Sequence, residues 1–123
     1  MNIESIVNFS TNEADVEHYH LDSEKRIVGN PAQTVENHFS SPCNQFHSGS
    51  WQSEKGCWKV SYTESEYCEI LAGSSIITDD SGSTMTVSKG SRFVIPAGFT
   101  GTWEVVEDCK KIYVMFEANN SVY

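Results

Sequence analysis

The chain has 123 residues, a length that favours a single domain, and its 38% hydrophobic and 20% charged residues are typical of a globular protein. Seventeen acidic residues against eight basic ones give a formal net charge of −9. Nucleic acids and anionic lipid surfaces both require a basic face on their partner, so we expect this chain to bind neither.

The amino-terminal sequence shows no signal for export or membrane insertion. Residues 1–5 carry no basic segment, Glu4 interrupts the first apolar stretch, and no run approaches the ~18 apolar residues of a membrane span. We therefore expect a cytoplasmic protein with no membrane partner.

The cysteine pattern favours thiols over metal binding. The four cysteines contain no C-x-x-C pair, which disfavours a structural zinc site. Their even number permits two disulfides, but a cytoplasmic location favours free thiols that are mostly buried. They are Cys43, Cys57, Cys68 and Cys109.

The predicted elements begin with a polar segment, residues 1–25, which has no lasting helical stripe and is predicted to form an amino-terminal arm. The rest of the chain divides into short runs in which apolar and polar residues alternate, and these runs predict β-strands. In chain order the strands cover residues 34–39, 45–51, 57–63, 67–71, 74–78, 84–88, 91–95, 102–106 and 112–116.

Turn residues separate these runs. The clearest hairpin lies at Asp79–Gly82, because Asp and Gly tolerate positive φ angles. The later turns are expected at Ala72-Gly73, Lys89-Gly90, Ala97-Gly98 and Glu107-Asp108. Short strands with a turn roughly every 8–10 residues are typical of an all-β sandwich or barrel.

Two motifs in the second half resemble those of the cupin superfamily, which read G-x5-H-x-H-x3or4-E-x6-G and G-x5-P-x-G-x2-H-x3-N. Glu66 and Gly73 fit the E-x6-G part of the first motif. Gly90, Pro96 and Gly98 fit the G-x5-P-x-G part of the second motif. The wider sequence is similar to small single-domain cupins of the ureidoglycine aminohydrolase-like or ethanolamine-utilisation-like kind.

This resemblance extends over about residues 26–117 and implies an all-β fold. It predicts one jelly-roll β-barrel of the cupin type over residues 26–123, preceded by the arm of residues 1–25. Cupins commonly pair, so the resemblance also implies a homodimer, in which the arm covers an exposed edge strand or crosses to the partner.

The metal ligands of the family are mostly missing. A metal-bearing cupin usually presents three histidines and one glutamate, which suit a divalent first-row metal. The matching positions hold no histidine: they are Lys59 and Ser61, or Val60 and Tyr62 with the shorter spacing, and Gly101. Only Glu66 remains, so we expect no metal and no other cofactor. The missing side chain at Gly101 is expected to leave room for a small ligand or water.

The four histidines lie outside both motifs. His18 and His20 belong to the polar arm, while His38 and His47 fall on separate predicted strands. Solvent exposure or packing is therefore a better interpretation of these side chains than metal ligation or catalysis.

Glu66 is the candidate catalytic residue. Enclosure among aromatic side chains would favour its protonated form, as general acid–base catalysis requires. A nearby Lys59 or Lys111 would instead hold it ionised in a buried pair. Alternatively, Glu66 is a leftover ligand satisfied by hydrogen bonds to Tyr62 or to the backbone.

The candidate binding residues surround Glu66. Cys68 lies on its face by period two, although no histidine accompanies this thiol as a base. Phe93 and Trp103 either stack on a planar substrate or fill the barrel. The sequence leaves open whether Trp58, Val60 and Tyr62 or Lys59 and Ser61 face inward. The complete candidate binding set is Lys59, Ser61, Tyr62, Cys68, Phe93 and Trp103.

Three functions fit these observations. The favoured one is a metal-independent enzyme or binder of a small nitrogenous or carboxylate metabolite, with Glu66 in the barrel. A metal-dependent enzyme of the ureidoglycine aminohydrolase type, which releases ammonia with manganese, would need histidines that the matching positions lack. The third is a non-catalytic dimerisation or accessory module whose barrel is filled by its own side chains.

Overall fold

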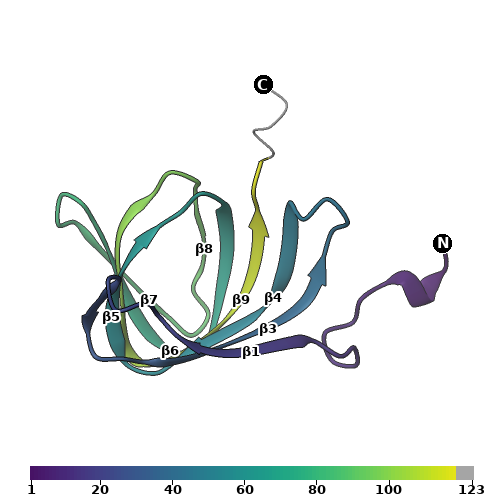
Figure 1. The fold of residues 1–123 in the computed structure, drawn as a ribbon, viewed down its shortest axis with the longest axis horizontal. Helices are drawn as coiled ribbons and strands as arrows, with labels where there is room; N and C mark the ends of the chain where they lie inside the picture. The colour runs from purple at the N-terminus through teal and green to yellow at the C-terminus, as the bar shows by residue number, and fades with distance from the viewer. Residues whose placement is uncertain (119–123) are drawn as a thin grey trace.

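The structure, a computed structural model, describes residues 1–118 and is built almost entirely from β-strands. Within these residues, nine strands form one curled sheet (Figure 1). The elements are η1 (Ile3–Ser5), β1 (Asp15–His20), β2 (Arg26–Val28), β3 (Ala32–Ser40), β4 (Phe46–Ser53), β5 (Gly56–Ser61), β6 (Ser65–Asp79), β7 (Thr84–Ser88), β8 (Arg92–Ile95) and β9 (Thr100–Phe116). The prediction of an all-β chain is confirmed.

The sheet is antiparallel throughout and follows the order β1-β3-β4-β9-β5-β2, while β6 pairs with β7, β8 and β9. The sheet curls into an open half-barrel, and its concave face encloses the interior (Figure 1). Because side chains alternate across each strand, one set lines this interior and the other set faces outward.

Two long bent strands hold the barrel together. The amino-terminal part of β6 pairs with β8 and its carboxy-terminal part with β7. In the same way, β9 pairs first with β5 and then with β4. Each long strand therefore contributes to two parts of the curled sheet.

The predicted turns at Ala72-Gly73 and Glu107-Asp108 are wrong, because both sites lie inside these long strands. The register of β6 against β9 shifts at Ala72 and again at Ser74, so the irregular residues form bulges that bend the pair. Gly73 has a φ of +79°, and a side chain there would collide with the backbone carbonyl of Asp108. Glycine and acidic residues mark a bulge here as readily as a turn.

The predicted arm contains a strand of the sheet. β1 pairs with β3 from Asp15 opposite Asn37 to His20 opposite Ala32. The segment before β1 extends away from the sheet in Figure 1, and it contacts β3 through the Phe9 ring, which stacks on His38 at 4.2 Å between centroids. Only the residues before β1 thus have the character of an arm.

The core lies within the curl and is built from alternate residues of β5, β6, β7, β8 and β9. It consists of Trp58, Ile70, Ile77, Val87, Ile95, Trp103, Val105 and Cys109. On β5, Val60 packs against this core with Trp58, whereas Lys59 and Ser61 are exposed. The structure therefore selects the alternative in which Trp58, Val60 and Tyr62 face inward.

Gly101 does not open the space that the sequence suggested. A side chain at this position would collide with the backbone carbonyl of Thr78 on β6. The expectation of room for a ligand at Gly101 is therefore wrong, because the neighbouring strand fills that space.

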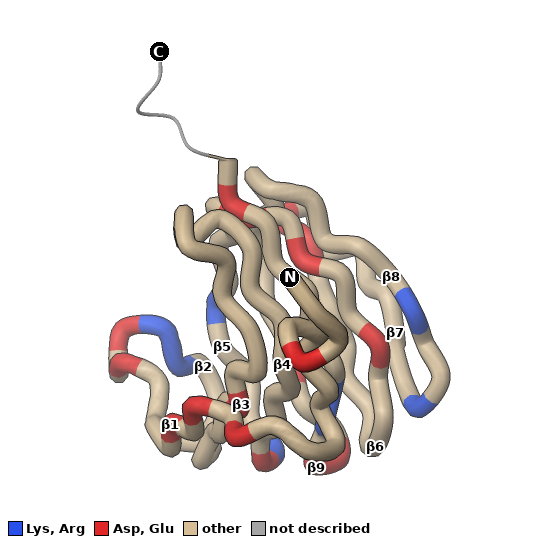
Figure 2. Tube along the Cα trace, turned by 90° about the vertical axis from the view of Figure 1, so that its right-hand side faces the viewer, with Lys and Arg blue, Asp and Glu red and all other residues tan. Residues whose placement is uncertain are grey.

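The outer surface carries most of the charged residues. On the side shown in Figure 2, acidic residues are spread over several strands and turns, and basic residues occur in separate small groups. None of the helical segments found in residues 1–118 has the length and hydrophobicity of a membrane span.

Candidate functional site

A cavity of about 530 Å³ opens on the concave side of the sheet. Residues of β1, β3, β4, β5, β6 and β9 line it, so segments from both ends of the chain meet there. All three tryptophans of the chain, Trp51, Trp58 and Trp103, contribute to its wall. Three tyrosines, Tyr19, Tyr62 and Tyr113, complete an aromatic lining.

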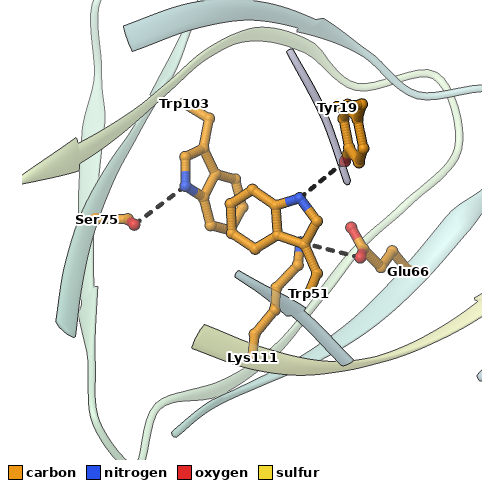
Figure 3. Close-up of polar contacts among 6 residues, drawn as sticks. All are labelled: Tyr19, Trp51, Glu66, Ser75, Trp103 and Lys111. Carbon is orange, nitrogen blue, oxygen red and sulfur yellow. Dashed lines mark hydrogen bonds and ion pairs between the residues drawn. The ribbon is translucent and has the colours of Figure 1, made fainter. Parts of the chain in front are cut away.

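A buried ion pair lies in this aromatic wall. Lys111 Nζ is 3.0 Å from Glu66 Oε2, and the side chains are 7% and 6% exposed (Figure 3). Lys111 stands opposite Ile70 in the β6–β9 register, four residues along β6 from Glu66. Its long aliphatic chain therefore runs along the inner face before the ammonium reaches the carboxylate.

Two indole rings flank the ammonium. Lys111 Nζ lies 4.7 Å from the ring centroid of Trp51 and 4.5 Å from that of Trp103. Both distances fall within the range of a cation–π interaction, which is stronger where water is excluded.

Electrostatics keep Lys111 charged despite its burial. Burial alone lowers the pKa of a lysine, but the negative charge of Glu66, together with that of Cys68 and Tyr62 once these groups ionise at alkaline pH, raises it by more. The net shift raises the pKa of Lys111 above its ordinary value, so the side chain is an ammonium at neutral pH.

Hydrogen bonds fix the aromatic residues around the pair. Trp51 Nε1 donates to Tyr19 Oη at 3.2 Å, and Trp103 Nε1 donates to Ser75 Oγ at 3.0 Å (Figure 3). Tyr113 Oη donates to Asn37 Oδ1 at 2.7 Å. The ring positions are therefore set by directed contacts as well as by packing.

Burial also suppresses ionisation of the phenols. It raises the pKa of Tyr113 to about 12, and it raises the pKa values of Tyr19 and Tyr62 above their ordinary value. At neutral pH all three hydroxyl groups are protonated, so they contribute hydrogen-bond donors to the site.

The structure brings part of the predicted site together. Glu66, Tyr62 and Trp103 line the cavity. Lys59 and Ser61 also line it, but they belong to the exposed positions of β5 and so lie at the rim.

The two other predicted binding residues lie apart from this cavity. Cys68 is fully buried, and burial raises its pKa to about 12, so the thiol is protonated at neutral pH. The ring of Phe93 packs against Trp103 at 6.3 Å between centroids and lines a second cavity of about 280 Å³. Phe93 thus supports the cavity wall through its contact with Trp103.

Sequence reasoning missed several residues of the site. Tyr19 falls in the predicted arm, and Trp51 and Tyr113 lie in predicted strands outside the two cupin motifs. The alternation of Lys111, Tyr113 and Met115 along β9 is the sequence signal for their inward orientation, and the sequence also indicates Lys111 as a partner for Glu66. Tyr19 carries no such signal, because it lies in a polar strand whose pattern does not reveal burial.

The thiols vary in exposure. Cys68 and Cys109 are buried, Cys57 is half-buried, and Cys43 is exposed. All four are free.

The residues present do not fit the metal that the cupin resemblance implies. Of the four ligand positions only Glu66 holds a ligand of the usual kind, and the ammonium of Lys111 already pairs with it. In the part of the chain that the structure describes, no three His, Cys, Asp or Glu side chains gather closely enough to hold a metal ion. Lys111 supplies the positive charge beside Glu66.

The curled antiparallel sheet and its internal cavity define a protein of the jelly-roll cupin class. The chain matches the model of the EutQ-like cupin domain over residues 40–113, more than half of its length, and it belongs to that family. The predicted membership of the cupin superfamily is confirmed. The finer ureidoglycine aminohydrolase-like assignment stays a prediction. No curated protein matches the chain.

Solved structures share this fold at low sequence identity. A DUF861-family protein of unknown function from Pseudomonas syringae has a TM-score of 0.75 at 19% identity, with 83% of this chain and 44% of that one covered. The Clostridium difficile EutQ protein has a TM-score of 0.66 at 18% identity, with 89% of this chain and 98% of that one covered. The Schizosaccharomyces pombe Cnp3 cupin domain has a TM-score of 0.61 at 15% identity, with 70% of this chain and 65% of that one covered. The chain thus spans less than half of the Pseudomonas protein. These likenesses confirm the jelly-roll cupin fold.

Proposed function

We propose that this chain is a small-molecule-binding cupin that holds its ligand without a metal ion. The observation that carries this proposal is the aromatic cavity of about 530 Å³ with the Lys111–Glu66 ion pair in its wall. Ligand sites are typically concave and mostly apolar, with a few fixed polar groups that orient the ligand. Its ligand class is a small nitrogenous or carboxylate metabolite.

In this proposal Glu66 acts with Lys111 as a polar anchor. The ammonium compensates the carboxylate and holds it at a fixed position in the wall. If the bound compound is also transformed, Glu66 is the group positioned to exchange a proton with it.

The two alternative functions have less support. A metal-dependent aminohydrolase needs ligands that the matching positions do not offer. An accessory module needs a barrel filled by its own side chains, whereas this barrel retains a cavity large enough for a small metabolite.

We also propose that the protein works in the cytoplasm as a homodimer. Exposed apolar residues near the amino terminus, Ile3 and Ile6, and an amino-terminal segment that extends from the sheet support pairing (Figure 1). Sedimentation equilibrium tests this part: a monomer at micromolar concentration would contradict it.

The ligand-binding proposal is tested by a thermal-shift screen of ureides, amino acids and short carboxylates, run beside elemental analysis of untagged protein. A ligand at 100 times its dissociation constant adds about 2.7 kcal/mol to the free energy of unfolding. The Glu66→Gln variant should lose the shift, whereas Glu69→Gln, which alters a position outside the cavity lining on the same strand, should keep it. Absence of any shift, or stoichiometric manganese or zinc, would contradict the proposal.

A further inference from the structure

The ion pair places a strong hydrogen-bond donor beside a strong acceptor in one cavity wall. Lys111 Nζ and Glu66 Oε2 are 3.0 Å apart, and both residues line the cavity. An ammonium has three N–H donors and a carboxylate has about four lone-pair sites, and their mutual contact uses one of each. In Figure 3 the second carboxylate oxygen of Glu66, which the dashed line to Lys111 does not reach, points toward the side where Tyr19 lies. The pair therefore presents a donor–acceptor edge.

The cavity lining carries no net charge. Lys111 and Glu66 neutralise each other within the wall. The other ionisable carboxylates and amines of the lining are also equal in number: Glu17 and Glu64, and Lys25 and Lys59. Beside the buried pair, an ionised ligand would lose its hydration while both nearby charges already neutralise each other, which is unfavourable. The charge balance thus favours an uncharged ligand.

The lining also favours a flat ligand. Indole rings of Trp51, Trp58 and Trp103 and phenol rings of Tyr19 and Tyr62 face the same space. Hydrogen bonds hold the Trp51 and Trp103 rings in place, so the walls present fixed planar surfaces. Planar rings stack on such surfaces at low conformational cost.

We infer that the ligand is an uncharged, planar compound with an amide edge, a ring N–H next to a C=O, as in a lactam, a cyclic imide or a pyrimidine base. The carbonyl accepts from the Lys111 ammonium while the ring N–H donates to the Glu66 carboxylate. This inference rests on the proposed small-molecule function and narrows it to one ligand chemistry.

Matched probes test the inference on the unaltered full-length protein. The first pair is 2-pyridone and N-methyl-2-pyridone, which differ in the N–H donor. The second pair is uracil and orotate, in which orotate adds a carboxylate. Binding is measured by calorimetry and by quenching of tryptophan fluorescence, because every tryptophan of the chain lines the cavity.

We expect 2-pyridone and uracil to bind. N-methyl-2-pyridone should bind more weakly than 2-pyridone by about 10- to 100-fold, the value of a hydrogen bond to a charged group. Orotate should bind more weakly than uracil because its carboxylate has to be desolvated. Glu66→Gln should weaken 2-pyridone by about as much, while Glu69→Gln should have no effect. Because the probe pairs are compared on the native protein, the result does not depend on a variant that fails to fold.

Two outcomes overturn the inference, and they differ from failure of the proposed function. Equal binding of 2-pyridone and its N-methyl derivative would contradict the contact between the ring N–H and Glu66. Tighter binding of orotate than of uracil would contradict the preference for an uncharged ligand. In both cases the cavity would still bind small molecules. Absence of binding by these probes and by the whole thermal-shift panel would overturn the proposed function as well.

Discussion

Lys111 is the residue on which the polar part of the site depends. Its ammonium is buried, paired with Glu66 and flanked by two indole rings. Taking two charges out of water carries a large desolvation cost, which their attraction offsets only in good geometry. We therefore propose that the pair serves ligand recognition rather than stability.

The first prediction concerns loss of this charge. Lys111→Met should lower the free energy of unfolding by about 3–5 kcal/mol, because it leaves Glu66 buried without a partner. The double variant Lys111→Met with Glu66→Gln should be more stable than the single variant, since no buried charge remains. Urea unfolding measures both effects, and Lys110→Met serves as the control outside the cavity lining. A loss below about 1 kcal/mol for Lys111→Met would contradict a buried ion pair.

The second prediction concerns alkaline pH. Burial raises the pKa of Cys68 from 9.0, and of Tyr113 from 10.0, to about 12 in each case. The pKa of Lys111 is also raised. Above pH ~9 the unfolded chain releases protons that the folded chain retains, so the free energy of unfolding falls as pH rises. This contribution is complete below pH ~9 and is lost as the pH rises towards ~12.

Melting temperatures at about pH 8 and about pH 11 measure this loss. The Cys68→Ala variant should lose less stability between these two pH values than the wild type. Cys43→Ala is the matched control, because Cys43 is exposed and its pKa is lowered by hydrogen bonds to Ser41 and to the backbone. A stability that is independent of pH over this range would contradict the assignment.

At the scale of elements, the bends in β6 and β9 create the concave wall that carries the site. The β8-paired part of β6 presents Glu66, and the β4-paired part of β9 presents Lys111. Without the bulges between Ile70 and Ser75 the pair would continue straight, and the inner face would not curl around a cavity.

The third prediction tests the bend at Gly73. Gly73→Ala should destabilise the protein by at least about 1 kcal/mol more than Gly82→Ala. Both residues have positive φ angles, but only at Gly73 does a side chain meet the backbone, at Asp108 and Glu107, whereas the space at Gly82 is open. Thermal or urea unfolding gives the comparison. Equal losses would show that backbone strain alone, without the collision, accounts for the effect.

At the scale of the whole molecule, the site exists because strands distant in sequence curl around one space. β1 supplies Tyr19 from the amino-terminal end, and β9 supplies Lys111 and Tyr113 from the other end. β1 is an edge strand paired with β3, so it closes one side of the cavity over Trp51.

The fourth prediction separates the arm from the edge strand. A variant lacking residues 1–13 should keep its cavity, because β1 remains paired with β3. A variant lacking residues 1–21 should show stronger quenching of tryptophan fluorescence by acrylamide, because Trp51 loses its contact with Tyr19. Equal quenching in the two variants would contradict a closing role for β1. Circular dichroism would show whether both variants retain the strands that follow β1.

The sequence alone determined the features that local chemistry encodes. The alternation of polar and apolar residues and the turn residues predicted the strands. The spacing of Glu66, Gly73, Gly90, Pro96 and Gly98 indicated the cupin fold. The missing histidines predicted a site without the usual metal ligands, and Glu66 remains the predicted centre of that site.

Tertiary structure decided what depends on register and curvature. It determined which face of β5 points inward, and it placed bulges where two turns were predicted. It also showed that a neighbouring strand fills the space at Gly101 and that Phe93 lines a different cavity. It also brought Tyr19 and Lys111 into one wall. Such contacts arise from pairing between distant segments, as where Phe46 on β4 lies opposite Phe116 on β9. A local pattern of polar and apolar residues does not specify which distant strand lies opposite.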